Sequence, residues 1–270
     1  MPTTGAILVI GDNGGAVLNP RNGSVTLISS EVIRGGPAGL PLGAYDPEDD
    51  LVYVDYGGDI NIVSPTTWSR VTQLPVSAES VAYDPVNQLV YFAGSSSPAS
   101  SGLYSVNSTT FQVQRVSSVG ANPQGVCVDP ATGQVYVANE GSGNLSVFDP
   151  ASGQPEASID AGSDAYACTV DDASHSIYVS DYNYNGGYNG YADGSVTVIN
   201  LTSRSEEGAI VVGDGPELPA MDSPASRLFV PNYGTSNVSV ISTSSQSVVS
   251  TIEIASPMEV AFDPEDSSFY

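Results

Sequence analysis

Four tyrosines in one short segment are the residues best suited to contact a ligand. The segment begins at Asp181 and is rich in tyrosine, asparagine and glycine. Tyrosine provides a large contact area and a hydroxyl group, and it loses little conformational entropy on binding. We therefore predict that these tyrosines bind a ligand together with three residues that we expect at the same edge of the folded protein. The predicted set is Tyr182, Tyr184, Tyr188, Tyr191, Asn139, Glu140 and Tyr233.

The same segment has oxygen-bearing side chains at the spacing of a calcium-binding loop. Such loops place them at the first, third, fifth and ninth positions, with glycine at the sixth. Those positions hold Asp181, Asn183, Asn185 and Asn189, with Gly186 at the sixth. The twelfth position is Ala192 instead of the usual glutamate, so the loop has little negative charge for a hard cation. The sequence favours a surface loop, with Ca²⁺ as the alternative, and it predicts no other cofactor.

The chain has few side chains that could carry out acid–base or nucleophilic catalysis with a histidine. His175 is the only histidine in the chain, and it lies in a turn-like stretch after Asp171 and Asp172. A Ser-His-Asp triad therefore depends on this one residue, and a metal site with several histidines is excluded within this chain. Other repeats of the chain have threonine, glutamate or asparagine in the same turn. We interpret His175 as a turn residue and predict no catalytic residues, which favours a non-enzymatic protein.

The elements that must position these residues belong to a repeat. An aspartate that opens a turn is followed about six residues later by Tyr-Val or a similar pair. The anchoring aspartates stand at positions 46, 84, 129, 171, 222 and 263, so the spacings are 38, 45, 42, 51 and 41 residues. A period of about 40–45 residues with only strand-like segments inside it is typical of a β-propeller.

We therefore predict an all-β protein, a β-propeller of four-stranded antiparallel blades in a single domain covering residues 1–270. Sequence typical of the second strand occurs at both ends, which favours seven blades with incomplete end blades over a six-bladed closed ring. The expected blades are 1–36 (partial), 37–76, 77–120, 121–162, 163–214, 215–256 and 257–270 (partial). Because the sequence stops within a repeat, we expect a fragment of a longer chain.

The repeat places two cysteines in the first strands of consecutive blades. Cys127 lies two residues before Asp129 and Cys168 lies three before Asp171, so their side chains have opposite parity and can face each other. Packed sheets lie about 10 Å apart, whereas a disulfide needs Cα atoms within about 7 Å. Two buried thiols are therefore favoured, and a Cys127–Cys168 disulfide is the alternative because inner strands converge.

The composition limits the classes of partner. The formal net charge is −24, from 30 acidic residues and 6 basic residues, and all six basic residues are arginine. Such a surface repels nucleic acid and anionic lipid. No stretch is long and apolar enough to span a membrane. We expect no nucleic-acid partner and no direct membrane insertion by this chain.

Five Asn-x-Ser/Thr sequons mark candidate glycosylation sites. They are Asn22, Asn107, Asn144, Asn200 and Asn237. Some arise by chance in a chain so rich in asparagine, serine and threonine, and those of Asn144 and Asn237 recur at one place in the repeat. Their use depends on secretion, and the sequence as given has no recognisable signal peptide.

Residues 136–149 resemble the YVTN repeat, in which Tyr-Val-Thr-Asn and a short loop precede Asn-x-Val-x-Val-Ile-Asp. Here Tyr136-Val137-Ala138-Asn139 precedes a second strand that runs from Asn144 to Asp149. Residues 229–241 match almost as well, and residues 178–200 match around an insertion. The resemblance covers nearly the whole chain, although the first two whole repeats are looser. The family has no universal catalytic set, so the resemblance implies no active site.

The resemblance also implies a setting for the protein. YVTN-repeat proteins include archaeal surface-layer-like proteins and bacterial periplasmic propellers, and the lysine-free composition is similar to the archaeal cell-surface group. We expect a non-enzymatic extracellular or cell-surface propeller, a recognition or structural module that binds protein, glycan or copies of itself. The alternatives are a lactonase-like hydrolase or lyase and a periplasmic ligand-binding propeller.

Overall fold

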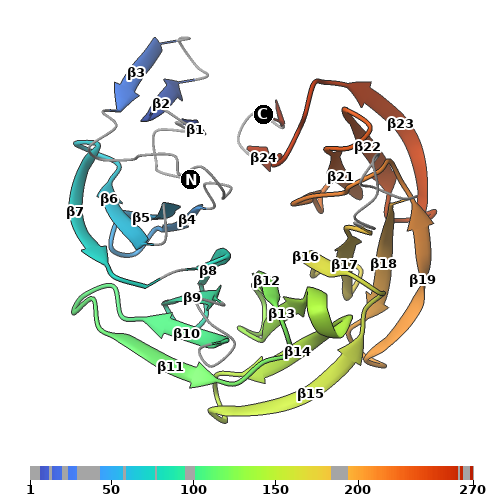
Figure 1. Ribbon diagram of the computed structural model, residues 1–270, viewed down its shortest axis with the longest axis horizontal. Coiled ribbons are helices and arrows are strands. Elements are labelled where there is room, and N and C mark those ends of the chain that lie inside the picture. Colours follow the sequence, from blue (N-terminus) through green and yellow to red (C-terminus); the bar gives the residue numbers. More distant parts are fainter. Residues whose placement is uncertain are drawn as a thin grey trace. The chain divides into compact units, whose positions relative to one another are not determined.

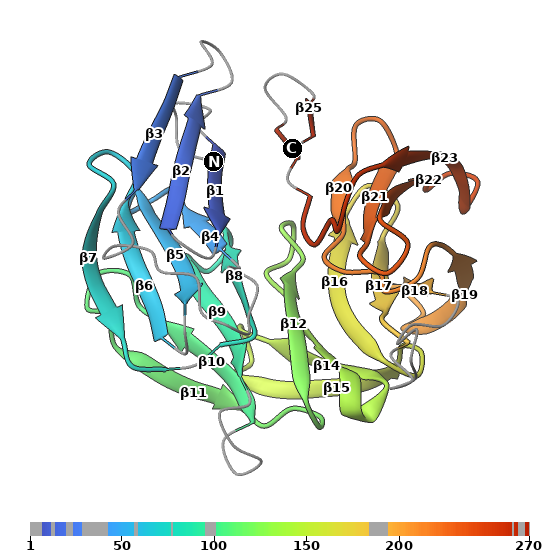
Figure 2. The ribbon, with the colours of Figure 1, turned by 45° about the horizontal axis from the view of Figure 1, so that its top comes forward.

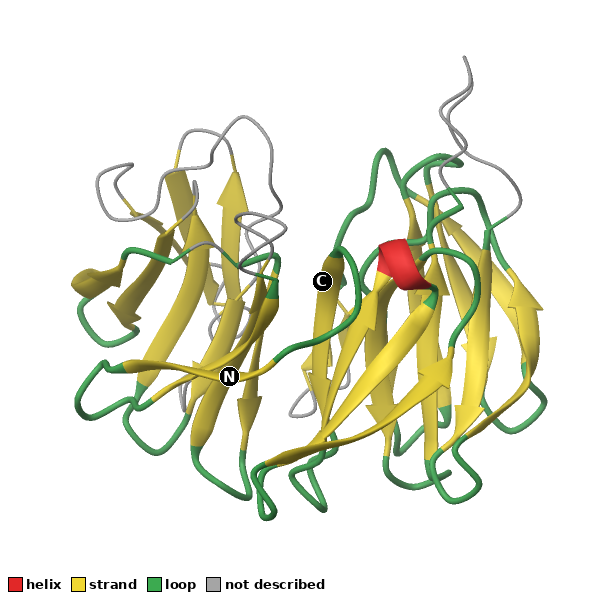
Figure 3. Ribbon diagram, turned by 60° about the horizontal axis from the view of Figure 1, so that its bottom comes forward, coloured by secondary structure: helices red, strands yellow, loops and turns green. Residues whose placement is uncertain are grey.

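The computed structural model describes ten stretches of the chain and two compact units, residues 1–118 and 119–270, which are treated separately below. The described stretches are 7–11, 14–19, 24–28, 43–56, 59–76, 78–94, 101–183, 194–260, 262–263 and 268–269. Within them the only helical element is the short 3-10 helix η1 (Glu140–Ser142), red in Figure 3. None of the described residues forms a helix capable of crossing a membrane.

The described residues of the first unit form one three-stranded and two four-stranded antiparallel sheets (Figure 1). The three-stranded sheet consists of β1 (Ile7–Gly11), β2 (Gly14–Asn19) and β3 (Ser24–Ile28). The next sheet consists of β4 (Gly43–Asp46), β5 (Leu51–Tyr56), β6 (Asp59–Ser64) and β7 (Ser69–Leu74). The third consists of β8 (Ser80–Asp84), β9 (Leu89–Gly94), β10 (Gly102–Val106) and β11 (Val113–Ser117).

In the second unit, the residues that the structure describes form three four-stranded antiparallel sheets and a two-stranded sheet. The first sheet is β12 (Pro123–Val128), β13 (Val135–Asn139), β14 (Asn144–Asp149) and β15 (Gln154–Asp160). The second is β16 (Ala165–Asp171), β17 (Ser176–Asp181), β18 (Ser195–Asn200) and β19 (Ser205–Val211). The third is β20 (Ala220–Asp222), β21 (Arg227–Asn232), β22 (Asn237–Ser242) and β23 (Ser247–Glu253), and the pair is β24 (Phe262–Asp263) with β25 (Ser268–Phe269).

This architecture confirms the predicted fold class, an all-β propeller of four-stranded antiparallel blades. Each of the five expected whole-blade ranges contains one four-stranded sheet whose strands pair in chain order. In the second unit the first strands of consecutive blades lie side by side, as Figure 2 shows for β12 and β16. The number of blades stays a prediction.

The repeated aspartates fix the turn between the first and second strand of each blade. Asp84 Oδ1 accepts hydrogen bonds from the backbone N–H groups of Val86 (2.9 Å) and Asn87 (3.1 Å). Asp129 is also buried, and its carboxylate accepts from the Ala131 N–H (2.9 Å) and from the Thr132 hydroxyl (2.7 Å). A carboxylate that caps backbone donors two residues ahead is a typical turn device. The repeat is therefore explained by turn formation.

The five four-stranded sheets bury their second strands, and within each unit neighbouring four-stranded sheets share one core. The recurring tyrosines of these strands, Tyr53, Tyr91, Tyr136 and Tyr178, are at most 2 % exposed. In the second unit, Ile159 of β15 packs with Ile177 and Val179 of β17 in the next blade. Neighbouring blades thus cover both faces of a blade. This explains why the sequences of the second strands are almost continuously apolar.

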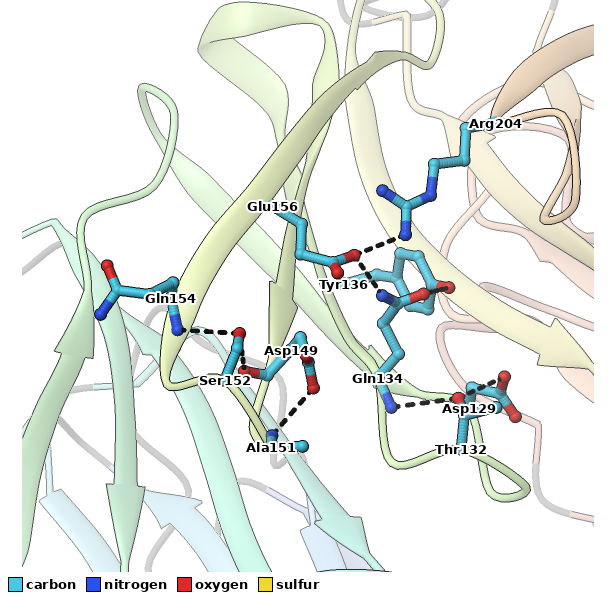
Figure 4. Close-up of polar contacts among 10 residues, drawn as sticks. All are labelled: Asp129, Thr132, Gln134, Tyr136, Asp149, Ala151, Ser152, Gln154, Glu156 and Arg204. Atoms are coloured by element: carbon cyan, nitrogen blue, oxygen red, sulfur yellow. Dashed lines mark hydrogen bonds and ion pairs between the residues drawn. The ribbon is translucent and has the colours of Figure 1, made fainter.

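A polar network at one end of these blades adds to the apolar contact (Figure 4). Glu156 on β15 forms an ion pair with Arg204, which lies in the turn between β18 and β19. Glu156 also accepts a hydrogen bond from the Gln134 amide (2.6 Å), and the Tyr136 hydroxyl donates to the same Gln134 side chain (2.6 Å). Arg204 therefore has a partner at the end of the strands where the aspartate turns lie.

Candidate functional site

The first strands of two consecutive blades are covalently joined. Cys127 on β12 and Cys168 on β16 form a disulfide with their Cα atoms 5.8 Å apart. The structure thus contains the alternative that the sequence left open beside two buried thiols. The two inner strands approach each other more closely than the roughly 10 Å separation of packed sheets, and this convergence permits the bond.

Asn139 and Asn232 occupy the same place in their blades, the end of the second strand. The Asn139 amide donates to Asn144 Oδ1 (2.9 Å) and Ser146 Oγ (3.0 Å). The Asn232 amide donates to Asn237 Oδ1 (2.8 Å) and to the Ser239 hydroxyl (2.9 Å). Both asparagines are 0 % exposed. The structure therefore gives Asn139, a predicted ligand contact, a local role in holding the third strand of its blade.

Asp181 takes this place in the intervening blade, and its hydrogen bonds are reversed. Its carboxylate accepts from Thr197 Oγ1 (3.0 Å), Ser195 Oγ (3.2 Å) and the Asp164 N–H (3.1 Å). Burial raises the pKa of Asp181 above its usual value, and these donors offset part of that rise. The predicted calcium ligands Asn185 and Asn189 lie outside the described residues. Among the residues that the structure describes, no group of three or more His, Cys, Asp or Glu could hold a metal ion.

Glu217 is a buried ionisable residue near this end of the strands. It lies in the connection from β19 to β20, and its side chain is only 2 % exposed. The side chains of Tyr166 and Tyr182 hydrogen-bond to its carboxyl group. The second carboxyl oxygen, Oε2, is buried without a hydrogen-bond partner. Burial raises the pKa of Glu217 to about 7, and the two tyrosine hydrogen bonds limit the rise.

The two tyrosines that contact Glu217 also stack on each other. Tyr166 lies on β16 and Tyr182 directly follows β17, with ring centroids 4.7 Å apart and planes inclined by 20°. Both residues are partly exposed. The Tyr182 N–H donates to the Asp164 carbonyl (3.2 Å), and the Ser180 hydroxyl donates to the Glu217 carbonyl (2.8 Å). We call Glu217, Tyr166 and Tyr182 the Glu217 site.

The Glu217 site combines two chemical capacities. A carboxyl group that titrates near neutral pH can donate or accept a proton, or it can receive a donor on its unpartnered oxygen. The stacked phenol rings provide an aromatic surface with hydroxyl groups. A site of this kind suits either recognition of a donor group or acid–base chemistry.

The other residues predicted to contact a ligand are not part of the Glu217 site in the region that the structure describes. Glu140 is partly exposed in η1 and accepts from the Asn122 amide (2.5 Å) and the Gln124 amide (3.0 Å). Tyr233 is partly exposed, and its N–H donates to the Gly215 carbonyl (2.9 Å). Tyr184, Tyr188 and Tyr191 lie outside the described residues. Among the predicted tyrosines, the part of the chain that the structure describes brings Tyr182 alone into the Glu217 site.

Sequence reasoning missed Glu217 and Tyr166. Nothing in the connection that holds Glu217 marks it, because the repeat that guided the prediction lies in the strands and turns. Its only mark in the sequence is that it is an acidic residue beside Leu218 and Pro219, three positions before β20. His175 is exposed in the turn between β16 and β17, away from this site, as the turn interpretation predicts.

The sequons differ in how their amides are used. Asn107 is exposed, and its Oδ1 accepts from the N–H groups of Thr109 (3.1 Å) and Thr110 (2.8 Å). Asn200 donates its amide to Glu207 (2.8 Å). Asn144 and Asn237 are partly buried partners of the strand-end asparagines, and Asn22 lies outside the described residues. Glycosylation of these sites stays a prediction.

Comparisons with known proteins agree on the fold. Residues 121–148 match the NHL repeat. A chain of the structure titled "Crystal structure of Nidogen/Laminin Complex" is 15 % identical, with 98 % of this chain and 96 % of that chain covered at a TM-score of 0.65. The structure titled "Dihydro-heme d1 dehydrogenase NirN in complex with DHE" is 13 % identical, with 95 % of this chain covered at a TM-score of 0.64.

These matches define the class of protein and no more than that. The chain spans only 56 % of the NirN chain. None of the curated proteins compared with it matches its sequence. The NHL match and the two structural neighbours together place the chain among repeat proteins with the β-propeller fold.

Proposed function

We propose that this chain is a non-enzymatic recognition or structural module that acts outside the cytosol, either secreted or at a cell surface. The observation that carries the proposal is the Glu217 site, where two stacked, partly exposed tyrosines lie over a buried carboxyl group. Tyrosine is enriched in binding surfaces because it gives rigid contact area and a hydroxyl group at low entropic cost. Fold alone does not assign a function, so the site carries the argument.

A protein partner is the favoured ligand class. The propeller that this chain covers almost from end to end comes from a complex between two proteins, nidogen and laminin. At 15 % identity that likeness concerns the fold, and it supports protein binding as a use of such a fold. Glycan binding and association with further copies of this chain are the alternative outcomes of the test below.

The setting outside the cytosol has separate support. The Cys127–Cys168 disulfide belongs to a class of bond that persists in oxidising compartments and is rare in the cytosol. The resemblance to YVTN-repeat proteins of the archaeal surface-layer type fits the same setting, and we propose that relationship as the finer family assignment. A periplasmic ligand-binding propeller is compatible with the same bond.

One observation favours a second candidate function, a lactonase-like hydrolase or lyase. General acid–base catalysis works best with a group whose pKa lies near the operating pH, and burial raises the pKa of Glu217 to about 7. Turnover of a panel of lactones that is lost in Glu217→Gln would support this function. Absence of turnover across the panel leaves the recognition module as the function.

The recognition function is tested by capture with a matched pair of variants. The tagged full chain is incubated with a cell-surface extract of the source organism, and retained proteins are identified by mass spectrometry. We expect a partner that is retained by the wild type and by Tyr45→Ala, a partly exposed tyrosine in another blade. The same partner must be lost from Tyr166→Ala/Tyr182→Ala. An unchanged set of partners in the double variant would contradict the proposal.

A further inference from the structure

The second unit contains no basic residue near Glu217. Residues 119–270 include only three basic side chains, Arg204, Arg227 and His175. His175 precedes β17, Arg204 lies in the turn from β18 to β19, and Arg227 begins β21. Tyr182 follows β17, and the bridge between Pro216 and Asn232 places the Glu217 connection at the far end of β21. The three basic groups therefore lie at the opposite end of the strands from the Glu217 site.

The Glu217 carboxyl group is only partly satisfied. Tyr166 and Tyr182 supply hydrogen bonds, whereas Oε2 is buried and has no partner. A buried acceptor without a donor costs roughly 1–3 kcal/mol, and more when the group is charged. A buried ionised carboxylate is tolerated when a cation pairs with it and its remaining acceptor sites are filled. The site thus lacks one positively charged donor, which the second unit does not provide.

We propose that the Glu217 site binds a basic side chain, the guanidinium or ammonium group of an arginine or lysine presented by a partner protein. The cation donates to Glu217 Oε2 and lies against the rings of Tyr166 and Tyr182. This inference rests on the proposed recognition function and specifies the chemistry of its partner. Charge-assisted hydrogen bonds and cation–π contacts are the two interactions that such a group makes.

Access and long-range electrostatics favour the same ligand. Tyr166 and Tyr182 are partly exposed and their side chains hydrogen-bond to Glu217, so the carboxyl group is linked directly to residues that reach the surface. The formal charge of −24 attracts basic partners and accelerates their encounter at low ionic strength. An anionic or apolar ligand gains neither of these advantages and leaves Oε2 without a donor.

Binding of a cation must be coupled to loss of a proton. A carboxyl group with a pKa of about 7 is mostly protonated at pH 6 and mostly ionised at pH 8. A cation that binds only the ionised form therefore binds about tenfold more tightly at pH 8 than at pH 6. Other acidic groups on the elements around Glu217 are Asp164, Asp181, Asp214 in the same connection, and Glu259, whose backbone is bridged to that of Leu218. Asp164→Asn, Asp181→Asn, Asp214→Asn and Glu259→Gln separate their titration from that of Glu217.

The test compares two capped tripeptides, Gly-Arg-Gly and Gly-citrulline-Gly, which differ only in charge. Calorimetric titrations of the full chain at pH 6 and pH 8, in buffers of different ionisation enthalpy, report affinity and protons released. We expect preference for the arginine peptide, affinity about tenfold higher at pH 8, and release of about one proton at pH 6. Glu217→Gln should abolish the preference, and Glu206→Gln, an exposed glutamate on β19, should retain it.

The outcomes separate this inference from the recognition function. Equal binding of the two peptides by the wild type, or binding that releases no proton at pH 6, overturns the inference even if Glu217→Gln fails to fold. A preference that survives in Glu217→Gln overturns it as well. Capture of a partner that depends on Tyr166 and Tyr182 can still succeed in either case, and the recognition function then stands with a different ligand chemistry.

Discussion

Gly162, in the connection that leads from β15 to β16, packs directly against Asp181, the residue that ends the second strand of the next blade. A Cβ atom at residue 162 would lie 2.0 Å from Asp181 Oδ2, and the φ angle of Gly162 is +94°. Glycine alone satisfies both constraints, because it has no Cβ and readily adopts positive φ. The same approach recurs where Gly120 meets Asn139 and Gly213 meets Asn232. In each blade of the second unit, the segment that leads into the first strand therefore packs against the end of the second strand.

Gly162→Ala should therefore destabilise the protein strongly. We expect a loss of roughly 2–4 kcal/mol in the free energy of unfolding, from backbone strain and the clash with Asp181. Gly153→Ala is the matched control, because Gly153 also has positive φ (+67°) but no atom within 4 Å of the added Cβ. It should cost only about 1 kcal/mol. Urea unfolding measures both, and equal losses would refute the packing argument.

Stability should fall as the pH rises towards neutrality. Between the ordinary glutamate pKa of 4.5 and about 7, Glu217 keeps its proton in the folded protein and loses it in the unfolded chain. The folded state then binds more protons, so the free energy of unfolding decreases with pH, by roughly 1–3 kcal/mol across this window. Burial raises the pKa of Asp181 as well, which acts in the same direction. Urea midpoints from pH 4.5 to pH 8 should decline less steeply in Glu217→Gln than in the wild type, and an unchanged profile would count against the buried carboxyl group.

The disulfide should contribute substantially to stability. Cys127 and Cys168 are separated by 41 residues, and a bond closing a loop of that size stabilises by about 2–4 kcal/mol. Thermal melting of the wild type with and without reductant should reveal this difference. Cys127→Ser/Cys168→Ser should melt at the temperature of the reduced protein, and its melting temperature should not change when reductant is added. A wild type that is equally stable with and without reductant would contradict the bond.

Asn139→Asp should destabilise the protein, although the equivalent position of the next blade holds an aspartate, Asp181. The Asn139 amide donates to Asn144 Oδ1 and to the Asn144 carbonyl, which are acceptors that a carboxylate cannot use. Asp181 instead has hydroxyl donors from Ser195 and Thr197. We expect a loss of about 2–3 kcal/mol, because buried acceptors would face a buried charge. Chemical denaturation measures the loss, and a neutral effect would show that the position is insensitive to its partners.

The fold was predictable because its signals are local. The hydrogen-bond partners of Asp129 lie two and three residues ahead, at Ala131 and Thr132, so the turn can be predicted from the local sequence. The recurring tyrosines were predictable as strand residues for the same reason. The blade pattern therefore emerges from the chain without knowledge of tertiary contacts.

The candidate site was only partly predictable because its contacts are distant in the chain. Tyr182 was identified by residue type, whereas Tyr166 and Glu217 meet it only when the connection between blades folds over β16 and β17. Asn139 illustrates the same limit, since the sequence does not reveal that this polar residue at the end of a strand is 0 % exposed and hydrogen-bonds within its own blade. Burial and partner geometry, which decide both cases, depend on the assembled blades.

The most direct test of the account is the titration of the Glu217 carboxyl carbon by NMR, with and without the capped Gly-Arg-Gly peptide. The account predicts a midpoint near pH 7 for the free protein and a clear downward shift when the peptide is saturating, with no shift from the citrulline peptide. A midpoint near the ordinary glutamate value of 4.5, or one that the arginine peptide does not move, would contradict the Glu217 site as a receptor for a basic side chain.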